Sequence, residues 1–275
     1  MKMKRIKRTA REAVSILLGL LFLFPIVIIL LNSMKTNSEI YESLVSLPRQ
    51  IYWENYQVAW ANMVYPRAFS NTVIVVTLSL AMLIPFSAMA AYRIARSPYR
   101  MIRGMLVYFM LAMMLPFQTI MISLVQVLNA VGLTGTWTGY SLVQTALLCP
   151  FTIFLYRGSF NGIPLELEEA ARIDGASAWR TFATILFPLL KPTTVTLVIL
   201  NAMNIWNDYL VALLTISKKT KMTLQLSVVS YNGAYTVNWE LTLATLVIVI
   251  VPIMLLYLSM QKHIEAGMTA GSVKG

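Results

Sequence analysis

Five stretches of this 275-residue chain are almost free of charged residues, and their lengths restrict the fold to one that crosses a membrane. They cover residues 13–34, 68–92, 104–156, 192–217 and 241–261, and Asp208 is the one charge within them. A helix needs about 20 residues to cross the hydrocarbon core of a bilayer, so the third stretch can hold two spans. Glycines and threonines at 132–136 break that stretch. The pattern predicts an all-α integral membrane protein with six transmembrane helices, at about 13–34, 68–92, 104–130, 137–157, 193–216 and 241–261.

Composition and charge agree with this prediction. The chain is 58% hydrophobic with a mean hydropathy of +0.69, which is too apolar for a soluble domain of its size. A six-span arrangement places 16 of the 22 lysines and arginines on one side, so the positive-inside rule predicts cytoplasmic N- and C-termini. The basic residues lie near span ends, where lipid headgroups account for the net charge of +11 better than nucleic acid does. With no repeat or linker, residues 1–275 are expected to form a single transmembrane domain.

The predicted cytoplasmic loop at 158–192 is amphipathic and charged. Residues 165–173 are good helix formers, Asp174 and Gly175 form a turn signal, and Ser177 can begin a second short helix. Such a short helix is only marginally stable alone, so we expect another protein to bind this helix-turn-helix. The alternative is a solvated connector that lies on the lipid surface.

Polar residues in the fifth predicted span form a candidate solute path. Asn201, Asn204 and Asp208 follow a spacing that places them on one helical face. Unpaired amide and carboxylate groups are costly in hydrocarbon, so this face is expected to point into the bundle. The sequence supports equally a hydrogen-bonding path, with aromatic residues as stacking surfaces, and a set of interhelical polar contacts. The candidate path residues are Asn201, Asn204, Trp206, Asn207, Asp208, Tyr209 and, in the third span, Gln118.

The sequence contains none of the common enzyme motifs. It has no phosphate-binding loop, no zinc-protease motif and no nucleophile elbow, and His263 is its single histidine. We therefore expect no catalytic residue, no metal site and no cofactor bound by this chain. Prolines within spans are plausible bending points for a bundle that opens and closes; they are Pro85, Pro116, Pro150 and Pro252.

The loop at 158–192 resembles the EAA loop of ABC-importer permeases. The resemblance rests on Glu169-Ala170-Ala171, Gly175 four residues later, Ile185 and Pro188. Outside the loop the chain is similar to the smaller, six-span permease subunit of maltose-type carbohydrate importers. That similarity rests on Leu47-Pro48, Trp53, Asn55-Tyr56, Trp60, Asn71-Thr72, residues 91–96, Trp206-Asn207-Asp208-Tyr209 and the tail from Gln261 to Gly275. Phe187 departs from the loop signature, which usually has leucine there, and the change is conservative.

The resemblance implies a type I ABC importer permease fold in a bacterial or archaeal cytoplasmic membrane. It implies a heterodimer with a second homologous permease, two ATP-binding subunits that bind ATP and Mg, and an extracytoplasmic solute-binding protein. In the loop, it implies that Glu169 pairs with a basic residue of the ATPase and that Ala170 and Ala171 permit its close approach. Gly175 would set the turn, with a positive φ. The expected ATPase-coupling residues are Glu169, Ala170, Ala171, Asp174, Gly175, Ile185 and Pro188.

The predicted function is that of a permease subunit that forms half of the translocation pore of an ATP-driven sugar importer. Three alternatives stay open on the sequence. One is a proton-coupled secondary transporter of a polar solute, although a single span carboxylate is thin support for it. The second is an ABC permease for a non-sugar solute such as a glycerol phosphate. The third is a membrane-anchored interaction protein, which would not need polar residues inside its bundle.

Overall fold

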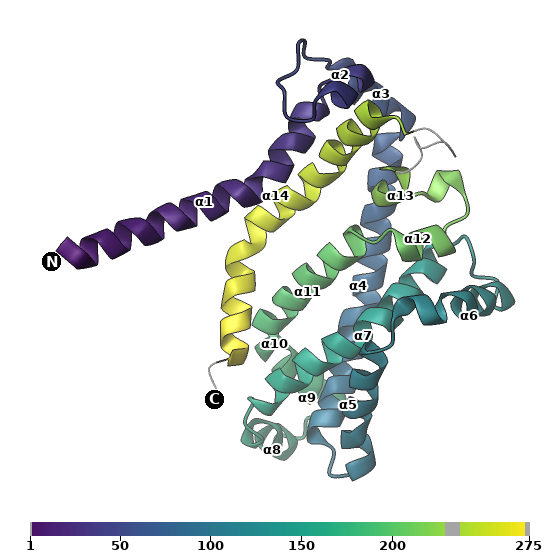
Figure 1. Cartoon of the computed structure of the whole chain (residues 1–275). Coiled ribbons are helices and arrows are strands. Elements are labelled where there is room, and N and C mark those ends of the chain that lie inside the picture. Colours follow the sequence, from purple (N-terminus) through teal and green to yellow (C-terminus); the bar gives the residue numbers. More distant parts are fainter. Residues whose placement is uncertain (1, 229–236, 273–275) are drawn as a thin grey trace. The chain divides into compact units, whose positions relative to one another are not determined.

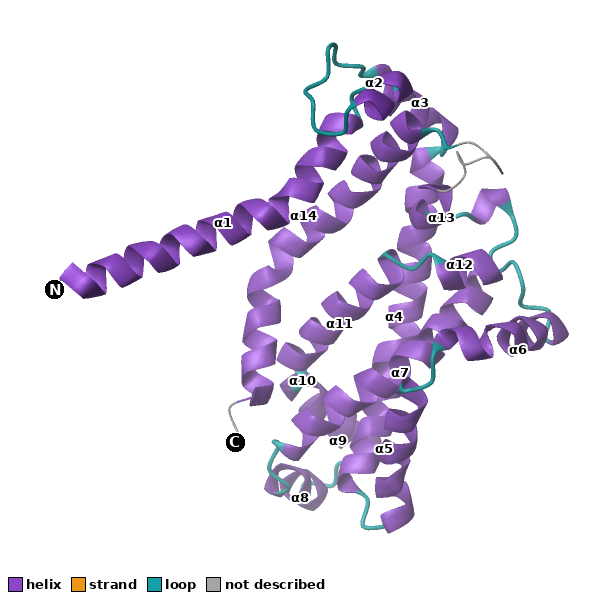
Figure 2. Ribbon diagram, in the orientation of Figure 1, coloured by secondary structure: helices purple, strands orange, loops and turns teal. Residues whose placement is uncertain are grey.

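The computed structural model describes the backbone of residues 2–228 and 237–272, and the side chains of residues 11–228 and 237–261. Tyr231, His263 and most of the C-terminal tail lie outside the described side chains. Most of the described residues are helical (Figure 2). The α-helices are labelled in Figure 1. In chain order the elements are α1 Lys2–Asn32, α2 Asn37–Glu42, α3 Glu54–Asn62, α4 Tyr65–Arg96, α5 Arg100–Met113, α6 Phe117–Ala130, α7 Trp137–Asn161, α8 Glu166–Ile173, α9 Ala178–Thr181, a π-helical turn Phe182–Leu186, α10 Phe187–Leu189, α11 Lys191–Trp206, α12 Leu210–Thr215, a 3₁₀ turn Lys219–Lys221, α13 Leu224–Val228 and α14 Trp239–Ser272.

Four helices are long and apolar enough to cross a membrane, and two bent helix pairs bring the number to six if each pair counts as one span. The four continuous candidates are Arg11–Asn32, Tyr65–Arg96, Trp137–Asn161 and Trp239–Gln261. The bent pairs are α5 with α6, which meet at 102°, and the segment Ala178–Leu189 with α11, which meet at 75°. The predicted all-α membrane fold is confirmed in this form.

Two predicted spans differ in detail from the structure. Pro116 is expected from the sequence to kink a continuous third span, but α5 ends at Met113 and Pro116 caps α6, so the chain turns there. A proline removes a backbone hydrogen bond and restricts the preceding residue, which allows a full break. The fifth span is also divided, since α11 ends at Trp206 and α12 begins at Leu210. The predicted turn at 132–136 does lie between two helices, α6 and α7.

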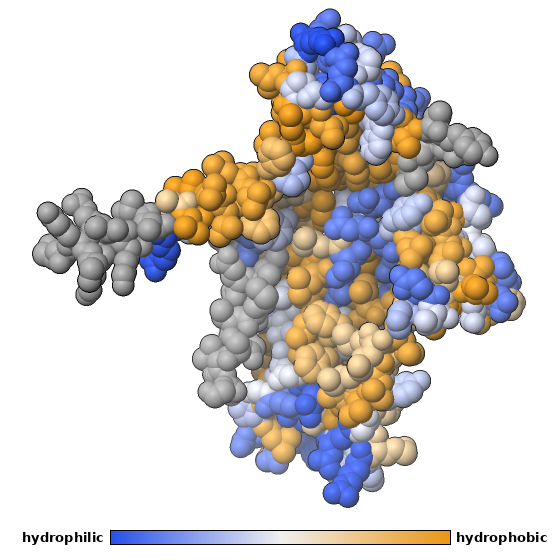
Figure 3. Space-filling view, in the orientation of Figure 1, coloured by the Kyte–Doolittle hydropathy of each residue, from blue (hydrophilic) through white to orange (hydrophobic). Residues whose placement is uncertain are grey.

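The chain forms two compact units. The first comprises residues 1–65 and 227–252, and it includes α1 to α3 and the first part of α14. The apolar stretch of α1 is not buried within the chain, and its apolar surface is visible in Figure 3. The second unit comprises residues 66–226 and 253–275, and it contains the predicted coupling loop and solute path.

A buried lysine organises the segment after α1 in the first unit. The Lys35 ammonium donates to Asn32 Oδ1 at 3.0 Å, to the Ser43 carbonyl at 2.9 Å and to Ser46 Oγ at 3.3 Å. Desolvation lowers the pKa of Lys35, and the nearby Glu39 charge partly opposes this shift. The amide of Asn55 donates to the carbonyls of Ser33 and Lys35, so the segment folds back on its own start.

In the second unit α7 is the central helix, and it packs against α5, α11 and α12. Two apolar clusters fill this unit. The first joins α4, α7 and the π-helical turn around Ile94, Tyr156, Phe160, Phe182 and Leu186. The second joins α4, α7, α11 and α12, and its buried members include Val75, Tyr140, Val143, Ile205 and Val211. The predicted coupling loop contributes Phe182 and Leu186 to the first cluster, and the polar residues of the fifth span border the second.

Candidate functional site

The loop at 158–192 contains the predicted helix-turn-helix, formed by α8 and α9. Acidic residues occupy the first turn of α8 and Arg172 its last turn, an arrangement that the helix dipole favours. At its end, the Ala176 N–H donates to the Ala171 carbonyl at 2.9 Å and the Gly175 N–H donates to the Arg172 carbonyl at 3.1 Å. These bonds form a Schellman motif, which requires a left-handed residue. Gly175 supplies it with φ +78°, so the expected positive φ is confirmed.

The second helix begins at the predicted residue. Ser177 is extended at φ −67° and ψ 157°, and its Oγ accepts from the Arg180 N–H at 3.3 Å. This is the N-cap arrangement that serine favours. Further along, Ile185 is half-buried in the π-helical turn, while Pro188 is exposed in the first turn of α10. These two residues therefore belong to the connection from α9 to α11 and lie outside the turn that contains Gly175.

The helix-turn-helix leaves large apolar side chains exposed. Ile173 is 86% exposed and Trp179 is 65% exposed, and Leu165 and Leu167 are also on the surface. Glu169, Ala170 and Asp174 are exposed as well. Ala171 is buried within its own chain at 5% exposure, which corrects the expectation that both alanines of the motif face a partner. Ala171 instead permits α8 to pack closely on the rest of the unit.

The residue that anchors α8 was not predicted. Glu168 is buried, and its Oε1 accepts from Arg96 Nε at 2.6 Å while its Oε2 accepts from the Tyr92 hydroxyl at 2.9 Å. Arg96 Nη2 also donates to the Ile163 carbonyl at 2.8 Å. Tyr92 and Arg96 are one turn apart at the C-terminal end of α4. Two features of the sequence could have indicated this contact. Tyr92 and Arg96 are four residues apart, and Glu168 is three residues before Ala171, so each pair lies on one helical face.

Asp208 lies in the break between α11 and α12. Its carboxylate accepts from the backbone N–H groups of Val211 at 3.3 Å and Ala212 at 3.0 Å, and from the Tyr140 hydroxyl at 3.1 Å. Gln144 Nε2 donates to the same hydroxyl at 3.0 Å, and both Tyr140 and Gln144 are buried. The Asp208 side chain thus caps the first turn of α12 from the position just before the N-cap residue, Tyr209. The expectation that it shares a helical face with Asn201 and Asn204 is wrong, because α11 ends before it.

The two asparagines of α11 have different surroundings. Asn201 is fully buried, and its amide donates to Thr152 Oγ1 at 3.2 Å and to the Leu197 carbonyl at 2.8 Å. Its Oδ1 is buried without a hydrogen-bond partner among the described residues. Asn204 is exposed on the chain, and its amide donates to the Leu200 carbonyl. Asn204 therefore presents its amide to the surface of the chain, whereas Asn201 does not.

The remaining candidate path residues are dispersed. Trp206 is buried edge-on against Phe69, with ring centroids 5.8 Å apart, so its ring is not free to stack on a solute in this conformation. Asn207 is exposed and accepts from Gln225 Nε2 at 3.3 Å, while Tyr209 packs against the second apolar cluster. Gln118 is exposed on α6. The structure groups Asp208 with Tyr140 and Gln144, and it does not bring all the predicted path residues together.

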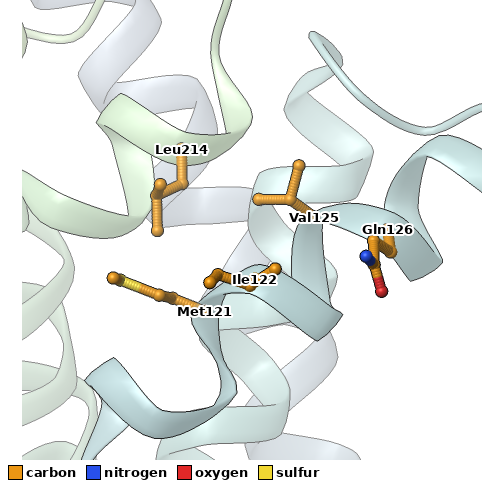
Figure 4. Close-up of a pocket in the computed structure, with 5 residues that line it drawn as sticks. All are labelled: Met121, Ile122, Val125, Gln126 and Leu214. Atoms are coloured by element: carbon orange, nitrogen blue, oxygen red, sulfur yellow. The ribbon is translucent and has the colours of Figure 1, made fainter.

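A shallow hollow of about 260 Å³ lies between α6 and α12 (Figure 4). Its apolar lining consists of Met121, Ile122, Val125 and Leu214, with Gln126 at its side. Such a lining offers little to a polar solute. Within the part of the chain that the structure describes, no group of His, Cys, Asp and Glu side chains could hold a metal ion.

Comparison with known proteins adds to this geometry. The family model described as binding-protein-dependent transport system inner membrane component matches residues 83–270. The chain is 38% identical to the probable starch degradation products transport system permease protein AmyC of Thermoanaerobacterium thermosulfurigenes, over 94% of each chain. It is 34% identical to the melibiose/raffinose/stachyose import permease protein MelC of Bacillus subtilis strain 168, over 91% of each chain.

A similar fold occurs in a solved structure. A chain of a bacterial ABC transporter involved in the import of the acidic polysaccharide alginate superposes with a TM-score of 0.79, covering 95% of this chain and 98% of that one. The two sequences are 22% identical, so this likeness concerns the fold alone. The predicted ABC importer permease fold is thereby confirmed.

Proposed function

The chain belongs to the family of binding-protein-dependent transport system inner membrane components, and we propose that it is the permease subunit of an ATP-driven importer of sugars. Membership of this family makes it a multi-pass transport component of the cytoplasmic membrane. In the proposed complex it forms half of the translocation pore beside a second homologous permease. The ATP and Mg are bound by two partner ATPase subunits, and an extracytoplasmic solute-binding protein delivers the sugar.

The proposal of an ATPase partner is supported by the exposed helix-turn-helix. Its outward surface combines Ile173, Trp179 and Leu167 with the acidic Glu169. Large exposed apolar side chains rimmed by charge are typical of a protein interaction surface. The sequence offers no nucleotide-binding loop of its own, so a separate ATPase is the partner that an ATP-driven permease requires. In this proposal Ala170 allows close approach, Glu169 pairs with a basic ATPase residue, and Gly175, Asp174, Ile185 and Pro188 keep the loop in shape.

Reversing the charge of Glu169 tests this docking. Glu169→Lys is expected to lower the amount of ATPase that co-purifies with the permease at least about tenfold, because juxtaposed like charges cost several kcal/mol. Glu54→Lys is the matched control, since Glu54 is likewise exposed in the first turn of a helix. The measurement is the ratio of ATPase to permease after affinity purification of the co-expressed complex. Equal retention in the two variants would contradict the proposed docking surface.

The proposed cargo is an uncharged, hydroxyl-rich solute. The relatives' names refer to starch degradation products and to melibiose, raffinose and stachyose. The polar side chains of residues 192–217 are mainly uncharged amides and hydroxyls, and no lysine or arginine occurs among these residues. Amides both donate to and accept from hydroxyl groups, whereas a phosphate favours cationic partners. This composition favours a sugar over a glycerol phosphate. Asn201, Asn204, Asn207, Gln118 and Asp208, with Trp206 and Tyr209, stay the proposed path residues.

A proton-coupled mechanism has less support. The one carboxylate within the six spans predicted from the sequence, Asp208, caps a helix and accepts three hydrogen bonds. A proton relay usually needs a chain of titratable groups through the membrane. The proposal of a sugar importer therefore explains the residues around Asp208 better than a proton-coupled transporter does.

We place both termini and the helix-turn-helix in the cytoplasm, on the charge distribution of the sequence. In this arrangement the apolar spans contact lipid tails and the basic residues at the span ends contact lipid headgroups. Nucleic acid is not a proposed partner. The segment that contains Tyr41, exposed at 70%, would then be outside, and Tyr99, also exposed, would be inside. The same charge distribution predicts that Tyr231 is outside, and this residue is not among the described ones.

Cysteine labelling tests this topology. Cys149 is the single cysteine, so Cys149→Ser gives a background free of other thiols. Tyr41→Cys is expected to react with a membrane-impermeant maleimide in intact cells, and Tyr99→Cys is expected to react only after permeabilisation. Protection of the cysteine at 41 together with labelling of the one at 99 would show the opposite orientation.

A further inference from the structure

The helix that presents the docking surface is attached to the rest of the chain mainly through one polar contact. Glu168 and Ala171 are the buried residues of α8, and Ala171 contributes only a methyl group. Glu168 instead makes an ion pair with Arg96 and accepts a hydrogen bond from Tyr92. Both Arg96 and Glu168 are largely shielded, with side-chain exposures of 17% and 9%. An ion pair that is taken out of water holds its geometry more firmly than an exposed one.

The partner helix α4 is also held at its other end. Asn71 Nδ2 donates to the carbonyls of Thr220 at 3.0 Å and Met222 at 2.9 Å. The neighbouring Thr72 Oγ1 accepts from the Leu224 N–H at 2.9 Å. These bonds fix the segment 220–224, which follows the divided fifth span. The helix is continuous through Pro85, the expected bending point, and its rise separates Asn71 from Arg96 by about 37 Å along α4.

We propose that the Glu168–Arg96 pair clamps α8 to α4 and makes α4 the strut that carries movement of α8 to the segment 220–224. The inference rests on the proposed docking of an ATPase on α8. A strut needs a fixed contact at each end, and the two polar contacts described above supply them. Apolar packing alone would let α8 slide on the unit, whereas a short, shielded ion pair with a second hydrogen bond resists sliding. Glu168 and Arg96 are thus positioning residues for coupling and do not themselves touch the solute or ATP.

The test measures the reactivity of a cysteine in the segment 220–224, which is bound to the N-terminal part of α4. It therefore needs no transported solute. Thr220 is exposed, and its side chain is not used by Asn71, which binds the backbone carbonyl. Thr220→Cys in the Cys149→Ser background is labelled with a maleimide in the purified complex, in lipid nanodiscs, with and without ATP and Mg. In the otherwise native complex, ATP is expected to change the labelling rate about fivefold or more, the low end of allosteric coupling.

The clamp variants are Glu168→Gln, Arg96→Gln and the two combined. Each single variant is expected to reduce the effect of ATP on labelling to less than about twofold while the ATPase subunits stay bound. The double variant should be no worse than either single one, because one substitution already breaks the pair. Glu42→Gln is the matched control, since it removes an ion pair with Arg49 of the same 2.6 Å length that is exposed to solvent. It should leave the ATP effect unchanged.

Three results would overturn the inference. One is an undiminished ATP effect in the single variants, and another is a native complex in which ATP leaves the labelling at 220 unaltered. The third is loss of the ATPase subunits from the variants, which would make the pair part of the docking surface rather than a link to α4. Failure of the proposed function would be visible separately, as a wild-type complex that does not retain an ATPase.

Discussion

Substituting Gly175 by valine is expected to abolish transport without disturbing the spans. Gly175 ends α8 with φ +78°, and a side chain placed there would have nothing within 4 Å, so steric contact with the rest of the chain has no part in the effect. The strain is in the backbone, where the left-handed region costs an L-residue about 1–2 kcal/mol and a β-branched residue more. A helix as short as α8 has little stability to offset this cost. Loss of the Schellman turn would change the angle at which α8 and α9 meet.

Two further variants separate the effect of backbone strain at Gly175 from the effect of side-chain size. Gly175→Asn should retain most of the uptake, because asparagine tolerates the left-handed conformation. Gly158→Val is the matched control for size, since Gly158 is an exposed helical glycine whose Cβ position likewise has nothing within 4 Å. The measurement is uptake, by cells that express the complete complex, of a radiolabelled sugar that the wild-type complex transports. Equal uptake by the valine and asparagine variants would contradict the role given to the left-handed turn.

Removal of the Asp208 carboxylate is expected to have the second large effect. Asp208→Ala leaves the Val211 and Ala212 N–H groups without their side-chain acceptor, and it leaves the Tyr140 hydroxyl only the Ile205 carbonyl, at 3.3 Å, as an acceptor. Loss of such a cap costs about 0.5–2 kcal/mol where the freed N–H groups can reach water, and about 1–3 kcal/mol for each N–H group that instead stays buried and unsatisfied. The alanine variant should therefore be strongly destabilised, with a lower thermal unfolding midpoint in detergent and little uptake.

Asp208→Asn separates the cap from the charge. Asparagine keeps the shape and one acceptor oxygen, and it is as good an N-cap as aspartate. We expect reduced but measurable uptake and an unfolding midpoint close to that of the wild type. A folded asparagine variant with no uptake at all would indicate that the charge itself is essential, as in a proton carrier.

The parts of the site that depend on neighbouring residues were predictable from the sequence. Gly175 and Ser177 act through bonds within a few residues of themselves, so the turn and the second helix could be placed without knowledge of the fold. The apolar spans were predictable for a similar reason, since length and hydropathy are local properties.

Contacts between distant residues were not predictable in the same way. Glu168 and Arg96 are 72 residues apart, and α8 offers three acidic residues in its first turn, of which only the packing of the helix selects one. The break at 207–209 contains neither glycine nor proline, so the sequence favoured a continuous span with Asp208 on its face. The surroundings of Asn201, Asn204 and Trp206 likewise depend on which helices pack against α11, and these come from distant parts of the chain.

The energy source of uptake tests the central claim most directly. Uptake of a radiolabelled sugar that the wild-type complex transports is measured in cells, once with the proton gradient collapsed by an ionophore while ATP is maintained, and once with ATP depleted while the gradient is kept. Both the wild type and Asp208→Asn are measured. An ATP-driven permease predicts that uptake persists in the first condition and stops in the second, for both proteins. Uptake that stops when the gradient collapses and continues without ATP would contradict the assignment of this chain to an ATP-driven importer.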